Sequence, residues 1–469
     1  MAPAPTVALY PGGSSWAELT HQHVTRTAAN AQAKLFRREL GLPSDVPVVM
    51  SGHQAQWWHA GILAKQMALA AACRRIGSGA AGAWVVVDQD ASDSLTISYP
   101  AKPASGDLPS RATWAIAPDA LAAQLRADVA IADLPPFIPT ATPTNAATAD
   151  INRGLRAIAD SAARWANAAT AAQQIARANA ELTAAALGSS PPLVFATSLL
   201  RTSAGRSLLE KMAEDPERCV AAYNDAVKSS GVHTIAPLSF VPEKSRYELP
   251  LWQLSGQGGG TKPSPRKRVF ASALGDTPLD TLAPRGVFMT ALLRWLGCDL
   301  FIHGTGGGAT GEEGGYDKVA EIWMRLWLGV DLAPSVVATA TVLLPMGPAW
   351  IAAEHDLYAA HRRVENARHT PRSLGDAQAQ LEKDSLVARI AATTDGAERH
   401  RLYRQLQAHL DRYRTAHTTE ITAATASIAA TAADVERHAI LRERTWPWPL
   451  LPRPDLLRLQ RTLAAQMEG

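Results

Sequence analysis

The segment of residues 51–61 holds the densest group of side chains that could do chemistry. It reads Ser-Gly-His-Gln-Ala-Gln-Trp-Trp-His-Ala-Gly and joins a stretch typical of a strand to one typical of a helix. Ligands of α/β sheets bind at the carboxyl ends of strands, and the free N–H groups at a helix start favour phosphate or carboxylate groups. The pattern therefore predicts an anion-binding loop. Its candidate residues are His53 for catalysis and Gly52, Gln54, His59 and Gly61 for cofactor binding.

This loop matches no common nucleotide-binding pattern. Its spacing is neither GxGxxG nor a Walker A sequence, so it predicts no conventional dinucleotide or P-loop site. It is similar to the His-x-Gly-His loops with which nucleotidyltransferase-like folds hold ATP phosphates, but Ile62 stands where the second histidine would be. The alternative is a purely structural interpretation of this segment, without a ligand. In it, Trp57 and Trp58 belong to the core, and His53 and His59 are capped surface residues.

An acidic group follows the next predicted strand. Asp88 and Asp90 come directly after the apolar stretch 83–87, and Asp93 lies three residues later. Crowded carboxylates at a strand end bind Mg²⁺, hold a substrate amine, or transfer a proton through one raised pKa. We expect Asp88 and Asp90 to be catalytic. We also expect Asp90 and His53 to face one pocket, because parallel strands end at the same edge of a sheet. The alternative is a solvated turn.

A glycine-rich segment after a further strand supplies the remaining candidates. Residues 299–302 predict the strand, and residues 304–315 include many glycines, which let a ligand approach the backbone closely. We expect Gly304 and Gly306 to bind a cofactor, with Lys318 adding a positive charge for phosphate. A plain mobile loop is the alternative. No HExxH motif occurs, and no resident metal ion is predicted.

These candidates need a sheet to position them. Residues 46–50 and 83–87 are apolar throughout, as expected of strands in a parallel sheet that helices cover on both faces. Residues 62–76 predict the helix that connects them in a right-handed crossover. Residues 16–40 predict another helix. The sequence thus predicts an α/β fold with a Rossmann-like parallel sheet core.

The C-terminal part predicts an α-helical coiled-coil arm. From residue 352 to 438 the chain is rich in Ala, Arg, Glu and Gln, and its apolar residues follow a spacing of about 3.5 residues. This seam comprises Leu406, Leu410, Tyr413, His417, Ile421, Ala424, Ile428 and Val435. Breaks at Gly375 and at Asp395 would fold the arm into an antiparallel hairpin. A long apolar seam needs a partner face, so we expect the arm to form a homodimer.

The expected domains follow from these segments. They are a core of residues 1–350 with a helical insertion at about 147–230, an arm of residues 351–440, and a tail of residues 441–469. The tail contains Trp446-Pro447-Trp448-Pro449, which should dock against the core.

Composition bounds the class of protein. Hydrophobic residues make up 47% of the 469 residues and charged residues 19%, which is typical of a globular chain with a large core. The net charge is only +3, and the one dense basic cluster, residues 266–268, lies in a Gly/Pro/Ser-rich stretch rather than beside aromatics that could stack on bases, so we predict no nucleic-acid partner. Three scattered cysteines, no signal peptide and no long apolar run predict a cytoplasmic protein without a membrane span.

The order of these segments resembles the cysteine-adding ligase family of bacillithiol biosynthesis. That family has a strand, a Gly-Gln-Gln loop and a helix, then a strand with an acidic end, and finally a coiled coil. The matching positions are Gly52-His53-Gln54, Asp88-Gln89-Asp90 and the arm. His53 replaces a glutamine of the family, and His59-Ala60-Gly61 stands where the family usually has Gly-Gly-Pro. The resemblance implies the fold, with the chain on a separate branch from the thiol-adding enzymes.

Two functions are therefore expected. The first is a ligase that uses ATP or a related nucleotide, with Mg²⁺, on a small-molecule substrate. The phosphates of the nucleotide would lie near residues 52–61, and Asp88 and Asp90 would be the acidic groups of the site. The second is a non-catalytic binding or scaffold protein that pairs through its coiled coil. Polar segments at two strand ends favour the enzyme.

Overall fold

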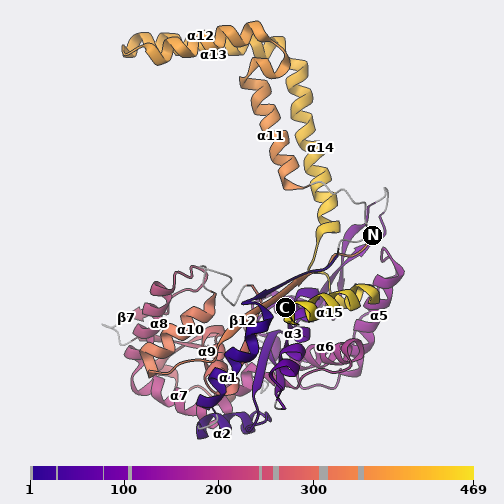
Figure 1. The fold of residues 1–469 in the computed structure, drawn as a ribbon, viewed down its shortest axis with the longest axis vertical. Helices are drawn as coiled ribbons and strands as arrows, with labels where there is room; N and C mark the ends of the chain where they lie inside the picture. The colour runs from indigo at the N-terminus through magenta and orange to yellow at the C-terminus, as the bar shows by residue number, and fades with distance from the viewer. Residues whose placement is uncertain are drawn as a thin grey trace. The chain divides into compact units, whose positions relative to one another are not determined.

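The computed structural model describes residues 4–27, 30–77, 79–103, 108–241, 246–256, 264–305, 315–346 and 353–468 (Figure 1). Contacts between residues divide the chain into two compact units. The arm unit holds residues 345–443 together with residues 103–110, and the core unit holds residues 3–102, 111–344 and 444–469. Among the described residues, no helix combines the length and the apolar character that a membrane span requires.

The core unit is organised around a six-stranded sheet. In spatial order its strands are β1 (Thr6–Tyr10), β12 (Ser335–Thr341), β11 (Leu300–His303), β2 (Val48–Gln54), β3 (Ala81–Val87) and β6 (Leu193–Phe195). β1 is antiparallel to β12, and the other neighbouring strands are parallel. The predicted parallel pairing of β2 with β3 is confirmed, and so is the place of β11 in the same sheet.

Strand β2 is longer than predicted. Residues 51–54 were expected in a loop, but they belong to the strand because their pairing with β3 continues to Gln54, which lies opposite Val87. On the other side of β2, the Ser51 hydroxyl donates a hydrogen bond to the carbonyl of Ile302 at 2.7 Å. The turn toward helix α3 (Ala60–Ile76) therefore starts only after Gln54.

Helices cover both faces of this sheet, as its apolar strands require. On one face α3 contacts β2, β3, β11 and β12, and it packs beside α1 (Trp16–Thr27) and α15 (Arg453–Glu468). On the other face, Met50 and Val85 share a core with five helices. These are α2 (Ala31–Glu39), α7 (Ser203–Glu214), α8 (Pro216–Ser230), α9 (Gly286–Leu292) and α10 (Tyr316–Leu328).

The predicted helix of residues 16–40 is divided into α1 and α2. Asn30 caps the second helix: its side chain accepts hydrogen bonds from the backbone N–H groups of Gln32 at 3.0 Å and Ala33 at 3.1 Å. An asparagine in this role satisfies the unpaired donors at a helix start, which favours a new helix over continuation of the old one.

Smaller elements complete the core unit. The remaining sheets are the pair β4 (Thr96–Ala101) and β5 (Ser110–Ala115), and a sheet of β10 (Leu282–Pro284), β8 (Arg246–Gln253), β7 (Phe240–Val241) and β9 (Lys267–Phe270). The remaining helices are α4 (Asp119–Arg126), α5 (Ala149–Arg164) and α6 (Ala171–Leu187). The region of residues 147–230, expected as a helical insertion, also contributes strand β6 to the main sheet.

The arm unit consists of paired helices. They are α11 (Glu354–His369), α12 (Ala377–Ala392), α13 (Gly396–Ala416) and α14 (Thr418–Arg442). α11 packs along α14, and α12 packs along α13 (Figure 1). Asp395 caps α13 at the predicted turn, and Gly375 has a φ of 83° just before α12. The predicted seam is not continuous, because the helix breaks at His417. Coiled-coil geometry stays a prediction.

The C-terminal tail packs within the core unit. Trp446 is 3% exposed and Trp448 is 4% exposed. The backbone N–H of Trp448 donates a hydrogen bond to the carbonyl of Trp58 at 2.7 Å, and Pro447 forms a β-bridge with His59. The tail therefore packs against the segment that joins β2 to α3.

Candidate functional site

A cavity of about 400 Å³ lies at the carboxyl ends of β2 and β11. Its walls come from these strands, from β3, from the first turns of α3 and from the start of α10. The polar side chains in its lining are His53, Gln54, His59, Lys65, Thr290, His303, Thr305, Tyr316, Thr339 and Arg444. Five of these ten side chains are basic residue types and none is a carboxylate, which favours an anionic ligand.

The position of the cavity follows from the strand order. Along the chain, β2 is followed by β3 and β6 on one side of it, whereas β11 and β12 lie on its other side. The order therefore reverses between β2 and β11. In open α/β sheets, ligands bind in the crevice at the carboxyl ends of the strands where such a reversal occurs. The sheet thus places its natural crevice between the ends of β2 and β11.

Lys65 is one of the cavity residues that sequence reasoning missed. It lies on α3, is only 4% exposed, and its ammonium group donates a hydrogen bond to the carbonyl of Gly52. The same group lies 5.3 Å from the centre of the Trp84 ring. Burial lowers the pKa of Lys65 from 10.5 to about 7, and no carboxylate among the described residues counteracts this shift. Lys65 therefore exchanges its proton near neutral pH.

His53, at the end of β2, and His59, at the start of α3, have different environments. His53 lies with its Nε2 3.1 Å from the side-chain nitrogen of Gln56. Burial lowers the pKa of His53 well below its usual value, and the charges of Lys65 and His59 lower it further. His59 is the N-cap of α3, and its Nδ1 accepts a hydrogen bond from the N–H of Gly61 at 3.0 Å. His53 is thus a neutral imidazole at neutral pH, and His59 has the capping role of the structural interpretation.

Glycine is required at two positions of the site. A β-carbon on Gly52 would lie 2.4 Å from the carbonyl oxygen of Val85, and one on Gly61 would lie 2.8 Å from the His59 ring. Trp57 and Trp58 are buried, as the structural interpretation held. The ring of Trp58 lies 5.0 Å from that of Trp84. The segment is therefore tightly packed around the cavity mouth.

The end of β11 and the start of α10 form the opposite wall. His303 Nε2 lies 2.6 Å from a carboxylate oxygen of Asp317, and both side chains are buried. Arg294 approaches the same carboxylate at 3.5 Å. Burial acts to raise the pKa of Asp317, but the charges of His303 and Arg294 outweigh it and leave that pKa below its usual value. Asp317 is therefore an ionised anchor that holds His303 at the cavity.

Asp88 and Asp90 do not line this cavity. Asp88 is buried and accepts hydrogen bonds from the N–H of Thr197 at 3.0 Å and from its hydroxyl at 2.6 Å. Burial raises the pKa of Asp88 to about 6. Asp90 pairs with Arg266 at 2.8 Å. The expectation that His53 and Asp90 face one pocket is thus corrected. Gln54 lines the cavity, and its side-chain N–H donates a hydrogen bond at 3.3 Å to Asp90, which does not line it.

The glycine-rich segment gives a mixed result. Gly304 lines the cavity, as expected of a residue that lets a ligand approach. Lys318 is exposed and does not line it, because the first turn of α10 presents Tyr316 there instead. Gly306 lies outside the described residues. The catalytic and binding roles of all these residues stay predictions.

A metal site is not formed by the candidates that the structure describes. Among the described residues, no group of three or more His, Cys, Asp or Glu side chains could hold a metal ion. Asp88 and Asp90 do not fit Mg²⁺, since Thr197 and Arg266 already engage them. The cavity does fit a phosphate or carboxylate, because it contains a buried lysine with no acidic partner among the described residues.

Comparison with known proteins assigns no family. No protein-family model and no curated protein matches the sequence. One solved structure that matches is that of a Campylobacter jejuni protein described as a "putative arginyl t-RNA synthetase". The match is 12% identical, covers 97% of this chain and 96% of the other, and has a TM-score of 0.25. At that TM-score the likeness carries no argument about fold or function.

Proposed function

We propose that this chain is a nucleotide-linked ligase that acts on a small metabolite and binds an anionic group of nucleotide or substrate at Lys65. The observation that carries the proposal is a buried lysine, with no carboxylate partner among the described residues, in a cavity where the strand order reverses. A buried charge without a partner is unfavourable, and a bound anion would relieve that cost. The cavity volume of about 400 Å³ suits a small ligand.

The proposed core is Rossmann-like. Numbered along the chain, its parallel strands β2, β3, β6, β11 and β12 lie in the spatial order 3-2-1-4-5, which is that of dinucleotide-binding sheets. The resemblance to the cysteine-adding ligase family of bacillithiol biosynthesis supports the same proposal through Gly52 and Gln54, which both line the cavity. The substitution of His53 in that loop argues for a different substrate from that of the family.

A bound nucleoside triphosphate would supply the phosphoryl or nucleotidyl group that activates a carboxylate for ligation. In this chain Lys65 and the other basic side chains that line the cavity would hold its phosphates. His53, neutral through burial, can accept a proton from the incoming nucleophile. Lys65, with a pKa of about 7, can release or take up a proton in the same cavity.

The first test is stabilisation by anions. Inorganic phosphate and ATP are each expected to raise the melting temperature, because binding to the native state alone stabilises it by about 2.7 kcal/mol at a hundredfold excess over Kd. His53→Ala is expected to weaken the response about tenfold, whereas Asp90→Asn keeps it, because Asp90 faces Arg266 rather than the cavity. Differential scanning fluorimetry across a ligand titration measures both.

Chloride at matched ionic strength controls for salt effects, and the melting temperature without ligand controls for folding. An equal response from chloride would mean that no specific anion site exists. If Asp90→Asn lost the ligand-induced rise in melting temperature and His53→Ala kept it, the anion site would lie at Asp90 rather than in the cavity. No response of the native protein to millimolar ATP would remove the nucleotide from the proposal.

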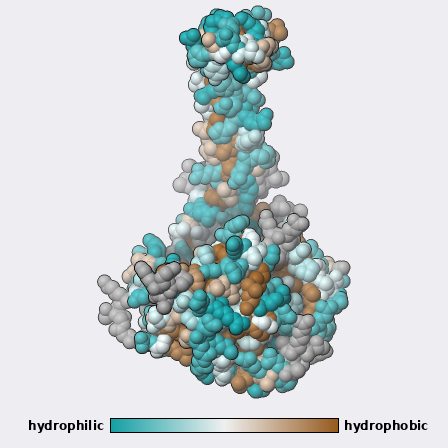
Figure 2. Space-filling model, turned by 90° about the vertical axis from the view of Figure 1, so that its left-hand side faces the viewer, coloured by the Kyte–Doolittle hydropathy of each residue, from teal (hydrophilic) through white to brown (hydrophobic). Residues whose placement is uncertain are grey.

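The second candidate function is a non-catalytic scaffold that forms homodimers through its arm. It is favoured by large apolar side chains that the arm leaves exposed, among them Leu381 at 60% and Tyr403 at 53%. Figure 2 shows hydrophobic side chains scattered between hydrophilic ones along the arm. The predicted seam residues Leu406, Leu410 and Tyr413 are instead buried within the chain, and the Tyr413 hydroxyl donates to the carbonyl of Ala367 at 2.7 Å.

For this second candidate we therefore expect a dimer held by the exposed Leu381 and Tyr403 rather than by the buried Leu406. The variant with Leu381→Asp and Tyr403→Asp is expected to be a monomer, because two carboxylates would be buried without partners in any interface there. Ser385→Asp, at an exposed polar position of the same helix, is the matched control and stays dimeric. Light scattering at micromolar concentration measures the mass, and a native chain of monomer mass contradicts the scaffold.

A further inference from the structure

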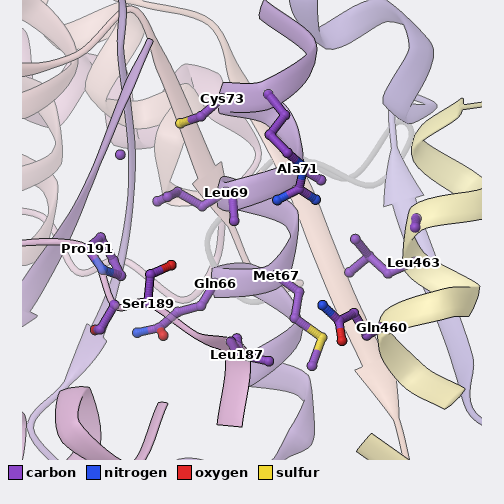
Figure 3. A pocket seen from close by; sticks show the side chains of 15 residues that line it. Gln66, Met67, Leu69, Ala71, Cys73, Leu187, Ser189, Pro191, Gln460 and Leu463 are labelled. Atoms are coloured by element: carbon purple, nitrogen blue, oxygen red, sulfur yellow. The ribbon is translucent and has the colours of Figure 1, made fainter. Parts of the chain in front are cut away.

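A second cavity, of about 280 Å³, lies beside α3 in the core unit. Gln66, Leu69 and Cys73 face it, and their spacing of three and seven residues places them on one stripe of the helix. Its other walls come from residues 187–191 and from α15. Figure 3 shows Gln66 with Ser189 on one side of the α3 ribbon and Leu463 on the other.

The amide of Gln66 is a buried polar group of this cavity. The residue is only 2% exposed, and neither its Nε2 nor its Oε1 has a hydrogen-bond partner among the described residues. The hydroxyl of Ser190, which also lines the cavity, is buried and unpaired in the same way. Buried polar groups are almost always hydrogen-bonded, so an amide kept without a partner next to a cavity indicates that the partner is a ligand.

We propose that this cavity binds a small molecule with an apolar body and one edge on which an N–H and a C=O lie side by side, as in a lactam. The amide of Gln66 presents the complementary C=O and N–H, so such an edge pairs with both atoms at once. The apolar body would lie against Met67, Leu69 and Leu463. This inference is independent of the ligase proposal, because it uses no residue of the Lys65 cavity.

Two classes of molecule carry this edge, and the walls discriminate between them. A saturated lactam has only carbon atoms beyond the edge. A nucleobase such as uracil has the same edge but a second carbonyl, which would lose its water where the body lies against Met67, Leu69 and Leu463, since none of these side chains can pair with it. The cavity therefore favours the lactam.

The test uses ε-caprolactam, N-methylcaprolactam and uracil as probes of the full-length chain, with saturation-transfer NMR titrations as the readout. Caprolactam is expected to bind saturably, and N-methylation, which removes the donor, to weaken binding at least tenfold. Uracil is expected to bind more weakly than caprolactam. Gln66→Leu should weaken caprolactam binding at least tenfold, while the melting temperature of this variant without ligand stays equal to that of the native chain or rises. Gln460→Leu, the same change at an exposed glutamine of the cavity rim, should change binding less than twofold.

Several results would overturn the proposal. They are absence of saturable caprolactam binding, equal binding of the N-methyl compound, uracil binding tighter than caprolactam, and unchanged binding in Gln66→Leu. A lower melting temperature of Gln66→Leu would also overturn it, because the amide would then already be paired by ordered water. If Gln66→Leu does not fold, Gln66→Met and the N-methyl comparison on the native chain decide the question by the same criteria.

Discussion

Replacing Lys65 with methionine is expected to increase the free energy of unfolding at pH 7 while it removes the response to phosphate. Burial lowers the pKa of Lys65 from 10.5 to about 7. A depression of that size corresponds to about 4 kcal/mol of lost stability at pH 7. Methionine has no charge to bury, and it fills a similar volume. The hydrogen bond to Gly52 that it loses has a net value of only about 1 kcal/mol, so the gain outweighs the loss.

The pH dependence gives this prediction its sign. Between pH 7 and 10.5 the unfolded chain binds a proton at Lys65 that the folded chain does not, so the stability of the native protein rises with pH. Below pH 7 both states are protonated and the full cost is present. The difference between Lys65→Met and the native protein is therefore largest at and below pH 7 and disappears above pH 10.5.

Urea denaturation at pH 6, 7, 9 and 10 measures this difference. Lys211→Met, at an exposed lysine of α7, is the matched control and should show no such trend. Phosphate binding to the native chain should also take up a proton at pH 8, because an anion beside Lys65 raises its pKa; calorimetry in two buffers of different ionisation enthalpy detects this. A Lys65→Met variant that is less stable at every pH would contradict the absence of an acidic partner.

The sheet that positions the cavity could be predicted from the sequence because its signal is local. The stretches that became β2 and β3 are apolar without alternation, which is typical of strands in a parallel sheet that helices cover on both faces. Parallel strands end at one edge, which is why His53 and Gly304 line the same cavity although they lie in distant segments. The end of β2 could not be placed, since its pairing with β3 to Gln54 is a tertiary contact.

Lys65, the buried cation of the cavity, is harder to recognise from the sequence. Between Ala60 and Ala72, helix α3 contains only two polar side chains, Lys65 and Gln66, in an otherwise apolar sequence. A helix that is apolar all round is buried, so two polar residues within it need special partners. Each of them lines a cavity. Had the helix been recognised as fully buried, both residues could have been selected.

Asp88 and Asp90 do not line the cavity for a different reason. Asp88 and Asp90 were placed correctly after β3, but their side chains are engaged by Thr197 and Arg266. Arg266 is 176 residues away in sequence from Asp90. No local pattern indicates a contact over such a distance. Similarly, Arg444 reaches the cavity from the tail, which the sequence predicted to dock on the core without indicating where.

Replacing Asp317 with alanine is expected to destabilise the core unit by about 1 to 3 kcal/mol, the cost of leaving buried hydrogen-bonding groups without a partner. Arg294 and His303 both lose the carboxylate that they approach, although Arg294, which is fully buried, keeps its ion pair with Glu321 at 2.5 Å. Asp331→Ala, which removes an exposed ion pair with Arg325 at 3.0 Å, is the control and should cost less than about 1 kcal/mol. Urea denaturation at pH 7 compares the two.

The pH dependence and a double variant identify the cause of that loss. The pKa of Asp317 is lowered in the folded state, so its stabilisation is complete above the unfolded value of 3.8 and disappears as pH falls through the folded value. The native protein should therefore lose more stability than Asp317→Ala on acidification below about pH 4. Arg294→Met combined with Asp317→Leu should cost less than the two single changes together, because no uncompensated charge of that pair remains. Additive losses would show that the two side chains stabilise the core separately, and that His303 is not held at the cavity by an ion pair shared with Arg294.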